Sequence, residues 1–190
     1  ERKSNSKFIK YKFNAYSSLA YIVTAFYLLN NTNDLFYINY IGIAISLLLG
    51  IVSFFWWALK RENIQKVDIC LYSALILWIG IYALCKLNSK YEIEISLFFV
   101  LLLLIFSYKV CCEIYRKKII ATVNIVSFIL SITILIYIAE VYKIYNLYYS
   151  IGLTVVAFLI KFADTYKLLD PEIIGSGTGW SHILTSIGIS

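Results

Sequence analysis

The chain has little charge, one proline and no methionine. Only 15% of its 190 residues are charged, whereas soluble domains carry about a quarter. Apolar residues make up 61% of the chain and aromatic residues 17%. This composition excludes an ordinary soluble domain and predicts an integral membrane protein. Because the chain contains no Met, we expect that Glu1 is not the translation start and that the chain is processed or truncated.

Cysteine spacing and net charge exclude two further interpretations. The 4 Cys have no C-x-x-C spacing, so we interpret them as apolar filler, with Cys111 and Cys112 as an alternative acylation site. The formal charge of +6 does not indicate a nucleic-acid partner, because most basic residues lie between apolar runs. There they serve to orient the chain in a membrane.

Seven apolar runs follow a basic, polar lead-in at residues 1–12. Continuous apolar runs predict membrane-crossing helices, since strands of a membrane barrel would alternate in polarity. We therefore expect an all-α fold in which residues 13–190 form one seven-transmembrane-helix bundle. The expected crossings lie at about 13–29, 35–59, 67–84, 93–112, 119–138, 147–163 and 173–190.

The basic residues are distributed unevenly between the two sides of this predicted bundle. Thirteen Lys and Arg residues lie on one side, in the lead-in, in the connections and, for Lys161, near the end of the sixth crossing, and three lie on the other side. The positive-inside rule then places the amino terminus in the cytosol, or in the matrix of a mitochondrion.

One stretch carries an ionisable group into an apolar run. The segment GIVSFFWWALKRENIQKVD at 50–68 ends one predicted crossing and begins the next on Asp68. An ionisable side chain is costly in lipid, so we expect Asp68 to face the bundle interior. The segment resembles the signature of the alkaline ceramidases, seven-helix membrane hydrolases, at Gly50, Ser53, Gln65 and Asp68. Where that family has a histidine, this chain has Trp57.

Two further segments are similar to the same family. FNAYSSL at 13–19 lies in the first predicted crossing, and WSHILTSIG at 180–188 lies in the seventh. Odd-numbered crossings begin, and even-numbered crossings end, on the same side of a membrane. The residues of all three segments are therefore expected to converge near one membrane face.

The resemblance implies a zinc site and shows that this chain departs from it. Family members are similar to zinc amidases in which three histidines hold the metal and an open position holds the attacking water. Carried over, Ser53 would stabilise the oxyanion, Asp68 would transfer a proton and His182 would be the last ligand. The other two ligand positions hold Trp57 and Thr178, and neither an indole nor a neutral hydroxyl is a good zinc ligand. We expect a vestigial site that binds no zinc, and a lost calcium site.

Each of these residues also has a purely structural interpretation. His182 could be a helix-packing histidine bonded to Asp68 or Ser53, Asp68 a satisfied carboxylate, and Ser53 a hydroxyl bonded back to its own helix. Interface anchoring or packing would explain three tryptophans and three charged residues at helix ends: Trp56, Trp57, Trp180, Glu140, Lys161 and Asp164. The glycine run at 175–179 lacks the lysine of a phosphate loop and would let the seventh helix pack closely.

These observations favour an inactive ceramidase-like protein that serves as a structural or lipid-binding subunit of a membrane assembly. Its partners would be membrane lipid and other membrane subunits. An active hydrolase of ceramide-type lipid amides is the alternative, and a seven-helix receptor is a second. The resemblance implies an endomembrane location, in the endoplasmic reticulum or Golgi, with the mitochondrial inner membrane as the alternative.

Overall fold

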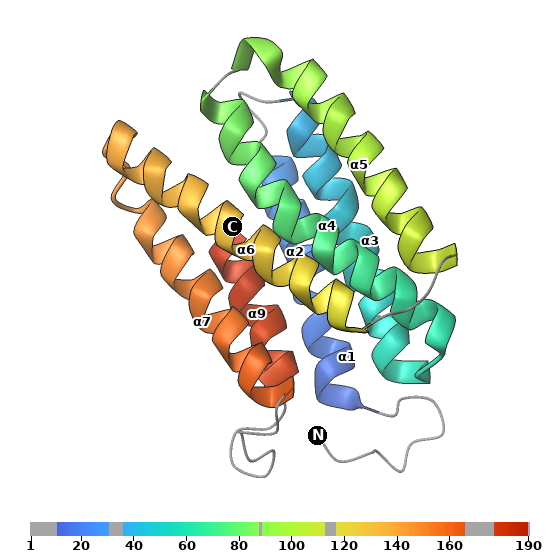
Figure 1. Cartoon of the computed structure of the whole chain (residues 1–190). Helices are drawn as coiled ribbons and strands as arrows, with labels where there is room; N and C mark the ends of the chain where they lie inside the picture. The colour runs from blue at the N-terminus through green and yellow to red at the C-terminus, as the bar shows by residue number, and fades with distance from the viewer. Residues whose placement is uncertain (1–10, 31–35, 88, 113–116, 166–176, 190) are drawn as a thin grey trace.

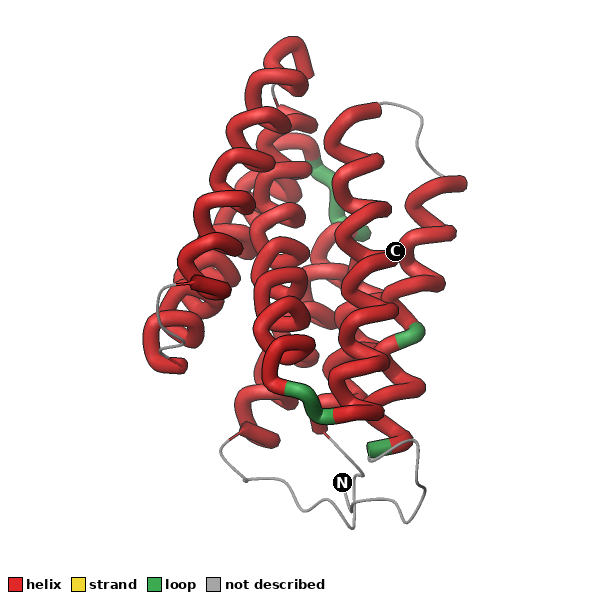
Figure 2. Tube along the Cα trace, turned by 90° about the vertical axis from the view of Figure 1, so that its right-hand side faces the viewer, coloured by secondary structure: helices red, strands yellow, loops and turns green. Residues whose placement is uncertain are grey.

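The fold consists of helices and short connections. The computed structural model describes residues 11–30, 36–87, 89–112, 117–165 and 177–189. No strand occurs in these ranges, as Figure 2 shows. The predicted all-α class is confirmed for this part of the chain.

Each predicted apolar run is helical over most of the residues that the structure describes within it. The first run forms two helices, α1 and α2, that meet at Leu19, where the amide donates to the Tyr16 carbonyl at 3.1 Å. The helices are α1 (Lys12–Ser18), α2 (Ala20–Asn30), α3 (Phe36–Leu59), α4 (Glu62–Leu87), α5 (Glu92–Cys112), α6 (Lys117–Tyr142), α7 (Leu147–Thr165) and α9 (Gly177–Ile189), with the 3-10 turn η1 (Ser89–Tyr91) before α5.

Three helices are long and apolar enough to cross a membrane, as far as the described residues extend. They are Tyr37–Leu59, Glu62–Leu87 and Leu147–Asp164. With 24 residues, α3 is about 36 Å long, which exceeds the roughly 30 Å of a bilayer's hydrocarbon core. The chain is therefore an integral membrane protein by length and composition of its helices, and a total of seven crossings stays a prediction.

The helices gather into a bundle with two distinct ends (Figure 1). At one end, here called the amino-terminal end, α1 and α9 begin, α3 meets α4, and α7 ends. The opposite end, here called the far end, contains the last turn of α4 and the first turn of α7. The bundle thereby brings the three segments of the family resemblance to the amino-terminal end, as expected from the order of the runs.

Helices α3, α4 and α5 surround the apolar core. Leu75 and Trp78 of α4 pack in this core with Phe99 of α5, and all three are at most 3% exposed. The Trp78 indole donates its N–H to the Ile38 carbonyl of α3 at 2.8 Å. This bond satisfies the one polar atom of a large side chain that is otherwise buried among hydrocarbon.

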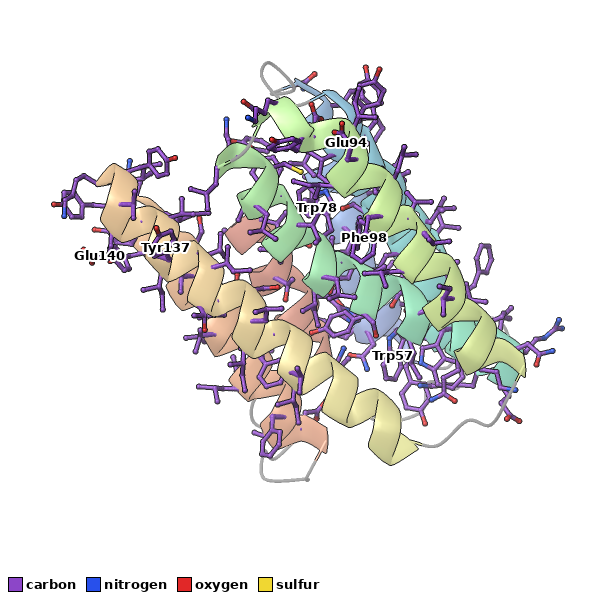
Figure 3. The ribbon with its side chains drawn as sticks, turned by 45° about the horizontal axis from the view of Figure 1, so that its top comes forward. Trp57, Trp78, Glu94, Phe98, Tyr137 and Glu140 are labelled. Carbon is purple, nitrogen blue, oxygen red and sulfur yellow. The ribbon has the colours of Figure 1, made fainter. Side chains whose placement is uncertain are left out.

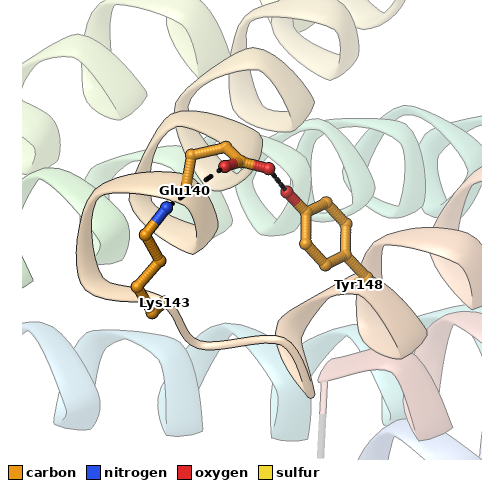
Figure 4. A network of polar contacts seen from close by, with 3 residues as sticks. All are labelled: Glu140, Lys143 and Tyr148. Carbon is orange, nitrogen blue, oxygen red and sulfur yellow. Dashed lines mark hydrogen bonds and ion pairs between the residues drawn. The ribbon is translucent and has the colours of Figure 1, made fainter.

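A polar network on the surface joins α6 to α7. Glu140 accepts a hydrogen bond from the Tyr148 hydroxyl and lies 3.8 Å from the Lys143 ammonium (Figure 4). Lys143 has a positive φ of 55°, which ends α6 and reverses the chain. Because Glu140 and Lys143 are exposed, their ion pair contributes little to stability, and the contacts chiefly define the turn.

Candidate functional site

Two glycines let three helices approach closely at the amino-terminal end. A Cβ added to Gly179 of α9 would lie 2.4 Å from the Phe13 ring of α1. A Cβ added to Gly50 of α3 would lie 2.6 Å from Ile22 and 3.3 Å from the Ser18 carbonyl. Small residues at such crossings allow helix backbones to meet, as is common in membrane bundles. These close approaches bring the turn after Gly179 in α9 and the turn after Gly50 in α3 against the last turn of α1.

His182 lies at the centre of this contact. The side chain is 3% exposed, and its Nδ1 atom is 3.3 Å from the Ser17 hydroxyl and 3.2 Å from the Ser18 hydroxyl. The Tyr21 ring packs against the imidazole with 5.5 Å between the ring centroids. The histidine therefore joins α9 to both α1 and α2.

A chain of hydrogen bonds links His182 to the two other predicted site residues. Ser18 contacts Ser53 of α3 with 3.1 Å between the hydroxyl oxygens, and Ser53 hydrogen-bonds to the Asp68 side chain. The predicted residues Ser53, Asp68 and His182 thus belong to one cluster. His182 reaches Ser53 through Ser18, so the cluster depends on a residue that the family comparison did not assign a role.

The donors in this cluster determine which nitrogen of His182 carries its proton. A carboxylate only accepts, so the Ser53 hydroxyl donates to Asp68. The Ser17 hydroxyl donates to the Asn14 carbonyl at 3.1 Å, and the Ser18 hydroxyl donates to the same carbonyl at 2.7 Å or to Ser53. When both hydroxyls donate to these oxygens, neither serine donates to His182. We infer on this basis that Nδ1 carries the imidazole proton and Nε2 the lone pair.

Asp68 has a cationic neighbour that sequence reasoning had placed at the membrane interface. Among the positive charges around Asp68, Lys161 of α7 acts most strongly on the carboxylate, and Lys60 acts less strongly. The Lys161 ammonium also lies over the Tyr72 ring, 3.5 Å from its centroid. Lys161, which is partly buried, therefore lies where its charge offsets the negative charge of Asp68. His182 was expected to bond to Asp68 or Ser53, and the structure connects it to Ser53 through Ser18.

The two non-histidine ligand positions make other contacts. Trp57 lies under the Lys60 ammonium, 3.2 Å from the ring centroid, and contacts the edge of Tyr11 at 5.9 Å. Figure 3 shows Trp57 toward the amino-terminal end and Trp78 closer to Glu94 at the far end. Thr178 donates its amide, at 2.8 Å, and its hydroxyl, at 2.5 Å, to the Asp164 carboxylate. Asp164 of α7 therefore caps the start of α9.

These residues do not fit the zinc site of the resembled family. In the part of the chain that the structure describes, no three His, Cys, Asp or Glu side chains come close enough to hold one metal ion. His182 has Nε2 as its only free nitrogen, Thr178 is bound to Asp164, and an indole has no lone pair for a metal. We therefore derive no chemical step through zinc.

Sequence reasoning placed Ser17 at this end of the bundle but did not assign Ser18, Tyr21 or Lys161 to the cluster. The serine pair lies inside the segment 13–19 that resembles the family, so a signal for it was present. The sequence shows a lysine near the end of an apolar run at position 161. It does not show whether that side chain lies near Asp68 or at the membrane interface. Residues 175 and 176 of the glycine run lie outside the described residues, while Gly179 has the predicted close-packing role.

Comparison with known proteins adds no assignment to this geometry. The chain matches no protein-family model, and it matches no curated protein.

Proposed function

We propose that the chain is a seven-crossing membrane protein of alkaline-ceramidase type that has kept the site as structure and does not hydrolyse lipid. It would serve as a structural or lipid-binding subunit of a membrane assembly. The observation that carries the proposal is the bonding of His182, whose Nδ1 faces the two serines of α1. An imidazole that joins three helices in this way stabilises a bundle without needing a metal.

The positive charge of Lys161, which stands where a metal ion would otherwise supply charge, supports the same proposal. A metal site would supply positive charge next to Asp68, and here the Lys161 ammonium is the strongest positive influence on that carboxylate. A carboxylate within a membrane bundle is costly unless a cation or hydrogen-bond donors accompany it. Asp68 has both, from Lys161 and Ser53. The cluster is thereby balanced without a divalent ion.

A metal-free hydrolase is the competing function, because a serine hydroxyl 3.2 Å from an imidazole resembles an activated nucleophile. In such an enzyme the unprotonated nitrogen accepts the serine proton. When Ser17 and Ser18 donate to the Asn14 carbonyl, Nδ1 is the donor toward the two serines. In that tautomer the nitrogen that faces the serines does not act as their base, which supports the structural role.

The test is an assay of ceramide amide hydrolysis by the purified chain in lipid vesicles. We expect no release of fatty acid above the protein-free control, and no difference between the wild type and His182→Ala. Release that depends on both His182 and Ser18 would replace the proposal with a metal-free hydrolase. Release that depends on His182 and on added zinc would replace it with a metalloenzyme.

A further inference from the structure

The far end of the bundle contains a cavity of about 330 Å³. Its wall is formed by α2, α3, α4, α6, α7 and α9, and α4 and α6 diverge toward it in Figure 1. Cavities that hold small molecules usually measure about 300–1,000 Å³. The far-end cavity is therefore large enough to hold part of a lipid, and it is separate from the His182 cluster.

One wall of the cavity is rigidly built. Trp78 lines it and is held by the hydrogen bond from its indole to the Ile38 carbonyl. The ring lies directly over Gly42 of α3, where an added Cβ would come within 2.3 Å of it. A hydrogen bond and a close glycine contact fix this indole, so the cavity wall is preorganised for an occupant.

Asn39 of α3 supplies an amide group to this wall. It lines the cavity and is 6% exposed. Two other polar groups of the wall are already engaged, since Trp78 donates to Ile38 and Thr154 donates to the Ser150 carbonyl at 2.8 Å. A side-chain amide offers two N–H donors and a carbonyl acceptor, so an occupant that both donates and accepts can form hydrogen bonds with Asn39.

The depth of Asn39 matches the polar end of a lipid. It is the fourth residue of α3, about 4.5 Å along the axis from the helix start. The cavity also includes Leu147, the first residue of α7. The ends of membrane-crossing helices lie near the level of the lipid headgroups. Apolar wall residues such as Ile79 and Leu135 then offer a surface to a lipid chain.

Charge restricts the class of headgroup. None of the described residues that line the cavity is acidic, basic or a histidine. A charged headgroup moved into this site would lose its hydration without gaining a counter-charge. An uncharged hydroxyl or amide can instead exchange hydrogen bonds with the Asn39 amide.

We infer that the far-end cavity binds a neutral lipid, with an uncharged hydroxyl or amide of its headgroup on Asn39 and an acyl chain along Ile79 and Leu135. This inference rests on the proposed lipid-binding function and names its site and ligand class. It requires no chemical reaction, and it places lipid recognition at the end of the bundle opposite the His182 cluster.

The test uses the full chain in phosphatidylcholine vesicles that contain a trace of diacylglycerol with a photoreactive group on its acyl chain. After irradiation, mass spectrometry locates the labelled peptides. We expect label on peptides that contain Ile79 or Leu135, and about fivefold less label in Asn39→Leu, since one hydrogen bond between neutral groups is lost. The matched control is Ser46→Ala, which lies two turns further along the same helix, is fully buried, and does not line the cavity.

Two results would overturn the inference. One is equal labelling of the wild type and Asn39→Leu at these peptides, when thermal unfolding shows that both are folded. The other is equal labelling by a photoreactive phosphatidylserine, which would remove the role of an uncharged headgroup. Neither result depends on hydrolysis. Fatty-acid release from ceramide by the wild type would overturn the proposed function while leaving the neutral-lipid site intact.

Discussion

At the scale of single residues, the protonated nitrogen of His182 decides between a structural imidazole and a catalytic base. The chain contains only one histidine, so its ring nitrogens give unambiguous signals in a nitrogen-15 NMR spectrum. We predict a neutral ring with the proton on Nδ1, because the hydroxyl protons of Ser17 and Ser18 are directed elsewhere. A spectrum of the Nε2-protonated ring would contradict the assigned hydrogen bonds.

The electrostatic influence of Lys161 on Asp68 gives a second prediction at this scale. Lys161→Met should lower the free energy of unfolding, because Asp68 loses its strongest cationic neighbour, and the loss should be smaller when Asp68→Asn is already present. A double-mutant cycle of thermal unfolding in detergent measures this coupling, expected at about 0.5–3 kcal/mol. Lys143→Met, which removes a lysine from an exposed ion pair, should be close to neutral. Additive effects of the two substitutions would show that the charges act independently.

At the scale of helices, the contact of α9 with α1 depends on the absence of a side chain at one position. Gly179→Ala would place a methyl group 2.4 Å from the Phe13 ring and 3.0 Å from the Asn14 side-chain oxygen. We expect it to lower the free energy of unfolding by about 1–3 kcal/mol, as overpacking does. The matched control is Gly152→Ala in α7, where an added Cβ meets nothing within 4 Å. If both variants have the same midpoint of thermal unfolding, the close approach does not hold α9 in place.

The helices were predictable from the sequence to a greater extent than the contacts between them. Apolar runs and polar connections locate helices because burial in lipid requires continuous apolar surface and internal hydrogen bonds. The break at Leu19 could not be predicted, because no proline or glycine marks it and the chain simply closes a tighter turn there. The sequence pattern located Ser53, Asp68 and His182 at one end of the bundle. It could not show that Ser18 stands between them or that Lys161 turns inward, because both depend on how the helices are rotated.

At the scale of the whole molecule, the distribution of basic residues predicts how the bundle sits in its membrane. Thirteen basic residues lie on the side of the amino terminus, in the lead-in, in the connections and, for Lys161, near the end of α7, and three lie on the other side. We expect an amino-terminal tag to face the cytosol or the matrix. Protease treatment of sealed vesicles, followed by detection of the tag, measures this directly. A tag protected as expected for the lumen or the intermembrane space would mean that helix packing overrides the charge asymmetry.

The content of zinc in the purified chain tests the central claim most directly. The account assigns the stability of the site to His182, its serine partners and the Lys161 charge, and it expects no bound metal. Elemental mass spectrometry of protein purified without chelators should find no stoichiometric zinc in the wild type, and the same background in His182→Ala. One zinc per chain in the wild type, lost in His182→Ala, would contradict the account and restore a metal centre at the amino-terminal end.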